Sequence, residues 1–127
     1  MKILRFLDRE NKIHYGWLNE NRIGLIDGDI YGECQRLEPS MSLSAVRVLP
    51  PVQPQKIICV GRNYTEHAAE QHVDIPESPQ LFLKPPSALI ADSETIVIPP
   101  QSNQVEHEAE LVAVIGKRGR WIPVEEC

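Results

Sequence analysis

The chain has 127 residues, which is long enough for a buried core but short for a large enzyme fold. Its content, 42% hydrophobic and 24% charged, is typical of a globular protein rather than a disordered or fibrous one. The formal net charge of −5, without any block of Lys and Arg, argues against nucleic acid or an anionic membrane as a partner. No apolar run approaches the roughly 20 residues of a membrane-spanning helix, and the N-terminus lacks a signal-peptide pattern, so we expect a cytoplasmic protein.

The first part of the chain has the pattern of a small antiparallel sheet. Residues 2–7, 12–18 and 22–26 read as short strands, with a turn at Asp27, Gly28 and Asp29. A loop rich in Ser and Pro follows. The prolines around residue 51 stiffen the chain there, so we place a domain boundary near residue 52.

The second part predicts further strands and one helix. Residues 56–60 read as a buried strand, residues 81–83 as a short one, and residues 105–115 as the longest strand, buried on both faces over 111–115. Asn63 and Glu66 resemble a capping box for a helix from Tyr64 to about His72. Pro123 with the acids after it resembles another helix start. The predicted fold class is therefore mainly β with few helices (α+β).

Glu108 and Glu110 are candidate metal ligands. On an extended strand their carboxylates project from the same face, where they repel one another unless they are protonated or share a cation. Carboxylate oxygens suit Mg²⁺. The alternative is a solvated strand face, which Glu106 on the same side favours, whereas the apolar run that follows favours a buried site.

Three further residues are candidates for catalysis. His67 and Glu70 lie three apart on the predicted helix, so the carboxylate can hold the imidazole as a general base requires; an exposed surface pair is the alternative. Lys84, fixed at a strand end by two prolines, could pair with a substrate carboxylate or extend along the surface as an ordinary lysine.

Four motifs in this order resemble the fumarylacetoacetate hydrolase family, especially its smaller bacterial-type members. They are residues 58–64 (ICVGRNY), 67–70 (HAAE), 81–85 (LFLKP) and 107–117 (HEAELVAVIGK). The resemblance runs from about Lys56 to the end of the chain, and residues 1–51 resemble, more weakly, the small N-terminal domain of some members. It implies a small N-terminal β domain over 1–51, and over 52–127 the N-terminal part of a catalytic domain with a mixed β-roll, usually homodimeric.

The resemblance also implies roles for the candidate residues. Glu108 and Glu110 correspond to the Glu-x-Glu ligands of Mg²⁺ or Mn²⁺, and His67 with Glu70 to the dyad that activates water. The family's third ligand, an aspartate in a later motif, has no counterpart in this sequence, so we expect the 127-residue chain alone to be inactive.

The implied reaction is metal-dependent hydrolysis of a carbon–carbon bond in an acylpyruvate-type 2-oxo acid. Isomerisation, hydration and oxaloacetate decarboxylation on the same scaffold remain open, as does an inactive fragment, because a fold fixes the site more than the substrate.

Overall fold

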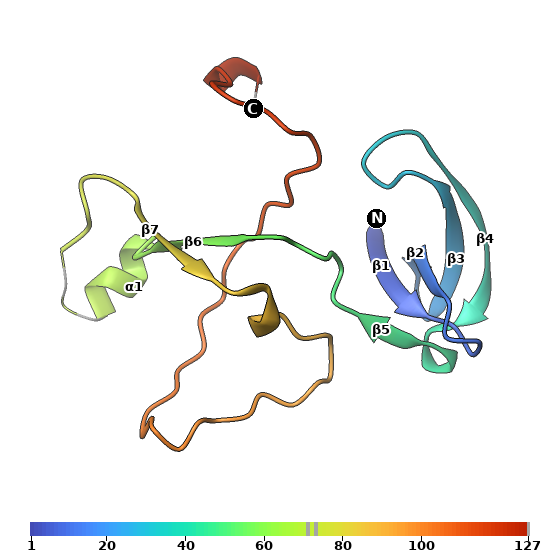
Figure 1. The fold of residues 1–127 in the computed structure, drawn as a ribbon, viewed down its shortest axis with the longest axis horizontal. Helices are drawn as coiled ribbons and strands as arrows, with labels where there is room; N and C mark the ends of the chain where they lie inside the picture. The colour runs from blue at the N-terminus through green and yellow to red at the C-terminus, as the bar shows by residue number, and fades with distance from the viewer. Residues whose placement is uncertain (71, 73, 127) are drawn as a thin grey trace.

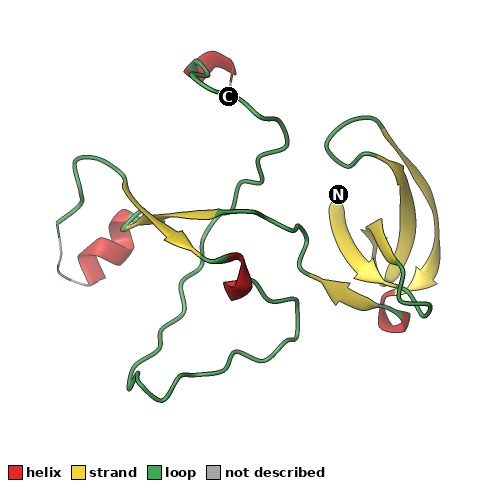
Figure 2. Ribbon diagram, viewed as in Figure 1, coloured by secondary structure: helices red, strands yellow, loops and turns green. Residues whose placement is uncertain are grey.

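The computed structural model describes residues 1–70, 72 and 74–126, apart from the side chain of His67 (Figure 1). The described residues form two antiparallel sheets and one α-helix, joined by long loops (Figure 2). The prediction of a mainly β chain with few helices is confirmed. Of the helices described, none has the length and apolar character needed to traverse a membrane.

The larger sheet contains five strands in the order β4-β3-β2-β1-β5. Three of them confirm the strands predicted for the first 31 residues, with ends shifted by up to two residues. Their bounds are β1 Lys2–Leu7, β2 Ile13–Asn19, β3 Arg22–Gly28, β4 Cys34–Ser42 and β5 Arg47–Leu49, with the 3-10 turn η1 Leu43–Ala45 between the last two.

The core of this sheet forms where β1 and β3 meet across β2. Phe6 and Ile23 are its largest fully buried side chains, and burial of each stabilises the fold by about 1.5–3 kcal/mol. Gly16 lies between them, and a Cβ added to it would lie 2.6 Å from Cγ2 of Ile23 and 3.0 Å from Cε1 of Phe6. A glycine is needed at position 16 because the two large side chains occupy that space.

Residues 34–42 form strand β4, so the prediction of a loop after residue 31 is wrong for these residues. The strand lies at the edge of the sheet, where Pro39 opposite Gly24 costs little because an edge strand has one unpaired side. The register shifts on both sides of Gly24, which marks bulges in β4. The indole of Trp17 donates to the carbonyl oxygen of Leu37 at 2.8 Å and so fixes one bulge to the middle of the sheet.

The turn between β3 and β4 comes slightly later than predicted. Gly28 ends β3 with φ +100°, a conformation that suits glycine. Asp29 then closes the turn: its N–H donates to the carbonyl of Glu33 at 3.0 Å, and its side chain accepts from the N–H of Tyr31 at 2.9 Å.

The second part of the chain contains fewer paired elements. Strand β6 Ile57–Gly61 pairs with β7 Gln80–Lys84, and α1 Thr65–Glu70 lies between them in sequence. Two short 3-10 turns follow, η2 Pro86–Ala88 and η3 Val124–Glu126, the latter immediately after Pro123. The strand predicted over 56–60 is confirmed, but its predicted burial is wrong, since the side chain of Ile58 is 63% exposed.

The strand predicted over residues 105–115 is absent. These residues adopt no regular secondary structure, and the apolar run expected to be buried is exposed, with Leu111 90% and Ile115 80% accessible. A strand requires a hydrogen-bonded neighbour, and among the described residues no strand pairs with this segment.

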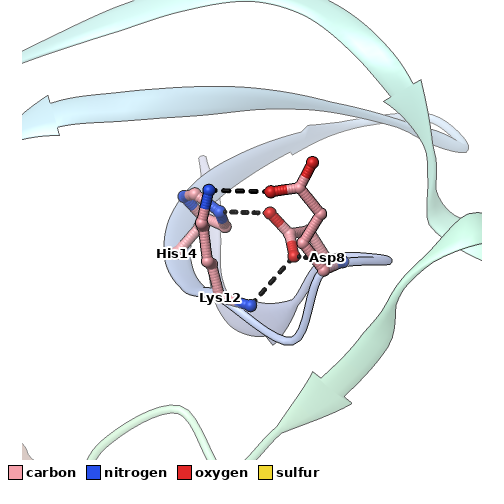
Figure 3. Close-up of polar contacts among 4 residues, drawn as sticks. Asp8, Lys12 and His14 are labelled. Carbon is pink, nitrogen blue, oxygen red and sulfur yellow. Dashed lines mark hydrogen bonds and ion pairs between the residues drawn. The ribbon is translucent and has the colours of Figure 1, made fainter.

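A polar cluster closes the β1–β2 hairpin (Figure 3). The carboxylate of Asp8 accepts from the backbone N–H groups of Glu10 and Lys12 at 2.8 and 2.9 Å, and its other oxygen lies 2.7 Å from Nε2 of His14. The hydrogen bond from Lys12, followed by that from His14, lowers the pKa of Asp8 below its ordinary value of 3.8. The ionised carboxylate thus holds the turn together.

We predict that Asp8→Asn lowers stability at neutral pH and removes part of the acid sensitivity of the sheet. A lowered pKa means that the carboxylate stabilises the fold above pH 3.8 and that this contribution is lost as the pH falls through the folded pKa. Denaturant titrations at pH 7 and pH 3, followed by circular dichroism, should show a smaller pH effect in the variant. Asp27→Asn, at an exposed position of β3, is the control; an equal effect there would contradict the prediction.

Candidate functional site

Helix α1 carries two of the predicted catalytic residues. As described it spans Thr65–Glu70, so it begins one residue later than predicted, after Arg62 turns the chain with φ +54°, and it does not include His72. Ala68 is fully buried and its N–H donates to the carbonyl of Tyr64 at 3.1 Å, which anchors the first turn. His67 and Glu70 both lie in α1. The side chain of His67 is outside the described part of the structure, so the dyad stays a prediction.

Glu108 and Glu110 lie in the segment 105–115 and are exposed. Because that segment is not a strand, the argument that strand geometry places their carboxylates on one face no longer applies. Their spacing in sequence still keeps them close together, since two residues span at most about 7 Å. Their role as metal ligands stays a prediction.

One hydrogen bond joins this segment to the start of α1. The backbone N–H of Leu111, the residue after Glu110, donates to the phenolic oxygen of Tyr64 at 3.3 Å. Tyr64 immediately precedes α1, so the contact brings the segment with the two glutamates to the helix that carries His67 and Glu70. The sequence interpretation treated Tyr64 as part of a motif and missed this role, because a contact between residues 47 apart leaves no local pattern in the sequence.

The residue just after this segment, Gly116, lies close to the turn between β3 and β4. A Cβ added to Gly116 would lie 3.1 Å from Cδ1 of Tyr31, which belongs to the β3–β4 turn. The backbone that follows the two glutamates therefore passes close to an aromatic ring of the first sheet.

Lys84 ends β7, opposite Ile57. Its ammonium lies 5.8 Å from the centroid of the Phe82 ring, within the range of a cation–π contact. Pro85 then caps η2 with φ −66°, so the chain after Lys84 is restricted as predicted. The proposed pairing of Lys84 with a substrate carboxylate stays a prediction.

The carboxylates of Glu108 and Glu110 suit a hard cation, but the described residues do not provide a complete set of metal ligands around them. No group of three or more His, Cys, Asp and Glu side chains in that part of the chain is arranged to hold a metal ion. Two carboxylates match the oxygen preference of Mg²⁺ or Mn²⁺, which favour near-octahedral coordination and accept water for the remaining positions. Glu108 and Glu110 can thus supply part of a coordination sphere.

Comparison with known proteins identifies the family. Residues 56–127 match the family described as fumarylacetoacetate (FAA) hydrolase C-terminal, which is more than half of the chain. The chain belongs to the fumarylacetoacetate hydrolase family. Residues 1–51 match a second family, described as Rv2993c-like, N-terminal.

The relatives of this chain include a tautomerase and an isomerase. It is 45% identical over 90 residues to the mitochondrial oxaloacetate tautomerase FAHD2A of Bos taurus, covering 70% of this chain and 29% of the relative. Its fold resembles that of 2-hydroxyhepta-2,4-diene-1,7-dioate isomerase from Mycobacterium marinum, with a TM-score of 0.55, 26% identity, and coverage of 71% and 34% of the two chains.

The fold also resembles that of an uncharacterised protein of Mycobacterium abscessus. The TM-score is 0.64 at 29% identity, over 80% of this chain and 40% of that one. This chain spans about a third of the length of the curated relatives that it matches.

We predict that Tyr64→Phe loosens the segment that carries the two glutamates. The phenylalanine keeps the ring but removes the acceptor for the Leu111 N–H, and a net hydrogen bond contributes about 0.5–1.5 kcal/mol. Amide hydrogen exchange at Leu111 should accelerate by roughly twofold to tenfold. Tyr15→Phe, in β2, is the control. Unchanged exchange at Leu111 in Tyr64→Phe would show that the contact does not hold the segment.

Proposed function

We propose that the intact protein catalyses divalent-metal-dependent enol chemistry on a 2-oxo acid, with tautomerisation or isomerisation as its reaction. The observation that carries the proposal is the Tyr64–Leu111 hydrogen bond, which links the segment of the candidate metal ligands to the helix of the candidate proton-transfer pair. The likeness to an oxaloacetate tautomerase and to a dienedioate isomerase favours this reaction class over hydrolysis.

In this proposal Glu108 and Glu110 hold the cation, Mg²⁺ or Mn²⁺. When bound, the cation supplies Lewis-acid charge that stabilises negative charge on the oxygens of a 2-oxo carboxylate. Both glutamates are exposed, so a substrate can approach the same edge of the segment from solvent.

His67 and Glu70 move the proton. Tautomerisation transfers one proton between carbon 3 and the oxygen on carbon 2 of the 2-oxo acid, with no atom gained or lost. His67 accepts that proton and returns it, while Glu70, one helical turn away, orients the imidazole. The ammonium of Lys84 pairs with a second carboxylate of the substrate.

Hydrolysis of a carbon–carbon bond is the second candidate. The family description of residues 56–127 favours it. Here the His67–Glu70 pair takes a proton from water, and the hydroxide adds to the carbonyl carbon at position 4, two carbons from the 2-oxo group. The bond between carbons 3 and 4 then breaks to give a carboxylate and the enolate of a 2-oxo acid, and the pair returns its proton to carbon 3 of that enolate. Hydratase and oxaloacetate decarboxylase activities use the same enolate and remain further variants of the proposal.

The remaining expectations for the intact protein follow from composition and family. We propose a small-molecule substrate, a homodimer and a cytoplasmic location, with neither nucleic acid nor membrane as a partner. Analytical ultracentrifugation of the intact protein tests the dimer; a monomer at micromolar concentration would contradict it.

We predict that Glu108→Gln and Glu110→Gln each abolish Mg²⁺-dependent activity of the intact protein. Glutamine keeps the size of the side chain but removes the charge that a hard cation requires. Tautomerisation of oxaloacetate is followed by enol absorbance and hydrolysis of an acylpyruvate by pyruvate release, while calorimetry measures Mg²⁺ affinity. Glu106→Gln, in the same exposed segment, is the matched control and should retain activity. Unchanged Mg²⁺ affinity in both variants would remove the metal assignment.

We predict that His67→Ala lowers turnover by about 10²–10⁴-fold, the usual contribution of a general base. Mg²⁺ affinity should stay within about twofold of wild type, because the proton-transfer pair handles protons rather than the ion. His72→Ala, just outside α1, is the control. Wild-type turnover in His67→Ala would make His67 an ordinary surface residue.

A further inference from the structure

A pocket lies between the five-stranded sheet and the turn η2, away from the candidate catalytic segment. Its walls come from β1 and β5, from the connection after β5, and from Pro86, Ser87 and Leu89. It has a volume of about 600 Å³ and is broadly open to solvent, and this volume is enough for a small organic molecule.

Arg5 is a buried cation in the wall of this pocket. Its side chain lies in the middle of β1 and the residue is 5% exposed, yet it forms no ion pair within the described residues. Its one hydrogen bond there runs from Nη1 to the carbonyl oxygen of Pro50 at 3.4 Å, which is long. The described residues contain no buried side-chain nitrogen or oxygen without a hydrogen-bond partner, so the other guanidinium nitrogens of Arg5 are open to the pocket rather than sealed in the core. They can donate hydrogen bonds to an anion that enters the pocket.

Arg47 provides a second positive charge on the same face of the sheet. In the β1–β5 pairing Arg5 lies opposite Leu49 and Leu7 opposite Arg47, so the two arginines are diagonal neighbours. Like charges so placed repel unless an anion lies between them. The described lining contains no Asp or Glu, although the chain as a whole carries a net charge of −5. The positive charge of the pocket is thus local.

The rest of the lining is largely apolar. Leu7, Ile13, Leu49, Val52 and Leu89 contribute to it, together with prolines. Such a wall suits the hydrocarbon part of a ligand, while a planar guanidinium suits a carboxylate, with which it can form two parallel hydrogen bonds.

We propose that this pocket is a binding site for a small organic carboxylate with an apolar body, separate from the site that contains Glu108 and Glu110. Arg5 and Arg47 bind the carboxylate, and the leucines and prolines cover the apolar part. The proposal does not depend on the proposed function, because none of the candidate catalytic residues lines the pocket.

The test is a titration of the intact protein with benzoate, with benzamide as the neutral analogue of the same shape. Backbone amide NMR signals of Leu7 and Leu49 report binding at this site. We expect saturable shifts with benzoate and at least tenfold weaker binding of benzamide. Arg47→Gln should weaken benzoate binding by roughly tenfold to hundredfold, the usual effect of losing a hydrogen bond to a charged group.

Controls separate this site from the catalytic one and from loss of folding. Arg47 is exposed, so Arg47→Gln should keep the circular dichroism spectrum of wild type. Arg9→Gln, at an exposed arginine outside the pocket, and Glu108→Gln should both bind benzoate as wild type does. Equal affinity for benzoate and benzamide, equal affinity in Arg47→Gln and wild type, or absence of saturable shifts at Leu7 and Leu49 would each overturn the proposal.

Discussion

The first half of the molecule depends on the packing of Phe6 and Ile23 over Gly16. Strand β2 lies between β1 and β3, so its own side chain at this point must be absent for the two large residues to meet. Close packing makes this arrangement specific: an added methyl group has nowhere to go without displacing β1 or β3. The face of β1 that carries Phe6 packs in the core. The opposite face, which carries Arg5, lines the pocket beside η2.

The second half is organised differently, because its apolar residues have few partners among the described elements. Strands β6 and β7 pair only with each other, and all of β7 is exposed. The contacts of the segment 105–115 with other parts of the chain include the hydrogen bond from the Leu111 N–H to Tyr64, and just beyond the segment the backbone of Gly116 lies close to the Tyr31 ring. These contacts fix where the segment passes rather than the direction of each side chain along it.

Sequence patterns predicted β1, β2 and β3, the approximate start of α1, and β6 and β7 as separate strands, since each depends on local alternation or on a local helix-start signal. The pairing of β6 with β7 was not predicted. The patterns failed for β4, whose Ser and Pro content indicates a loop, because an edge strand with bulges tolerates proline. They also failed for residues 105–115, because an apolar run reports the tendency to be buried but not the presence of a neighbouring strand. The Tyr64–Leu111 contact joins residues 47 apart and has no local signature.

In the candidate metal site two negative charges lie on a segment that few contacts hold in place. A neutral hydrogen bond at 3.3 Å, worth about 1 kcal/mol, cannot by itself hold two exposed carboxylates within the fraction of an ångström that coordination requires. Electrostatic repulsion between Glu108 and Glu110 acts against such ordering, and a divalent cation removes it. If Glu108 and Glu110 bind the proposed cation, binding and ordering of the segment would occur as one thermodynamic step, and part of the binding free energy would offset the cost of bringing the carboxylates together. Tyr64 would reduce that cost by keeping the segment at α1 before the cation binds, so a residue that is not a metal ligand would influence metal affinity.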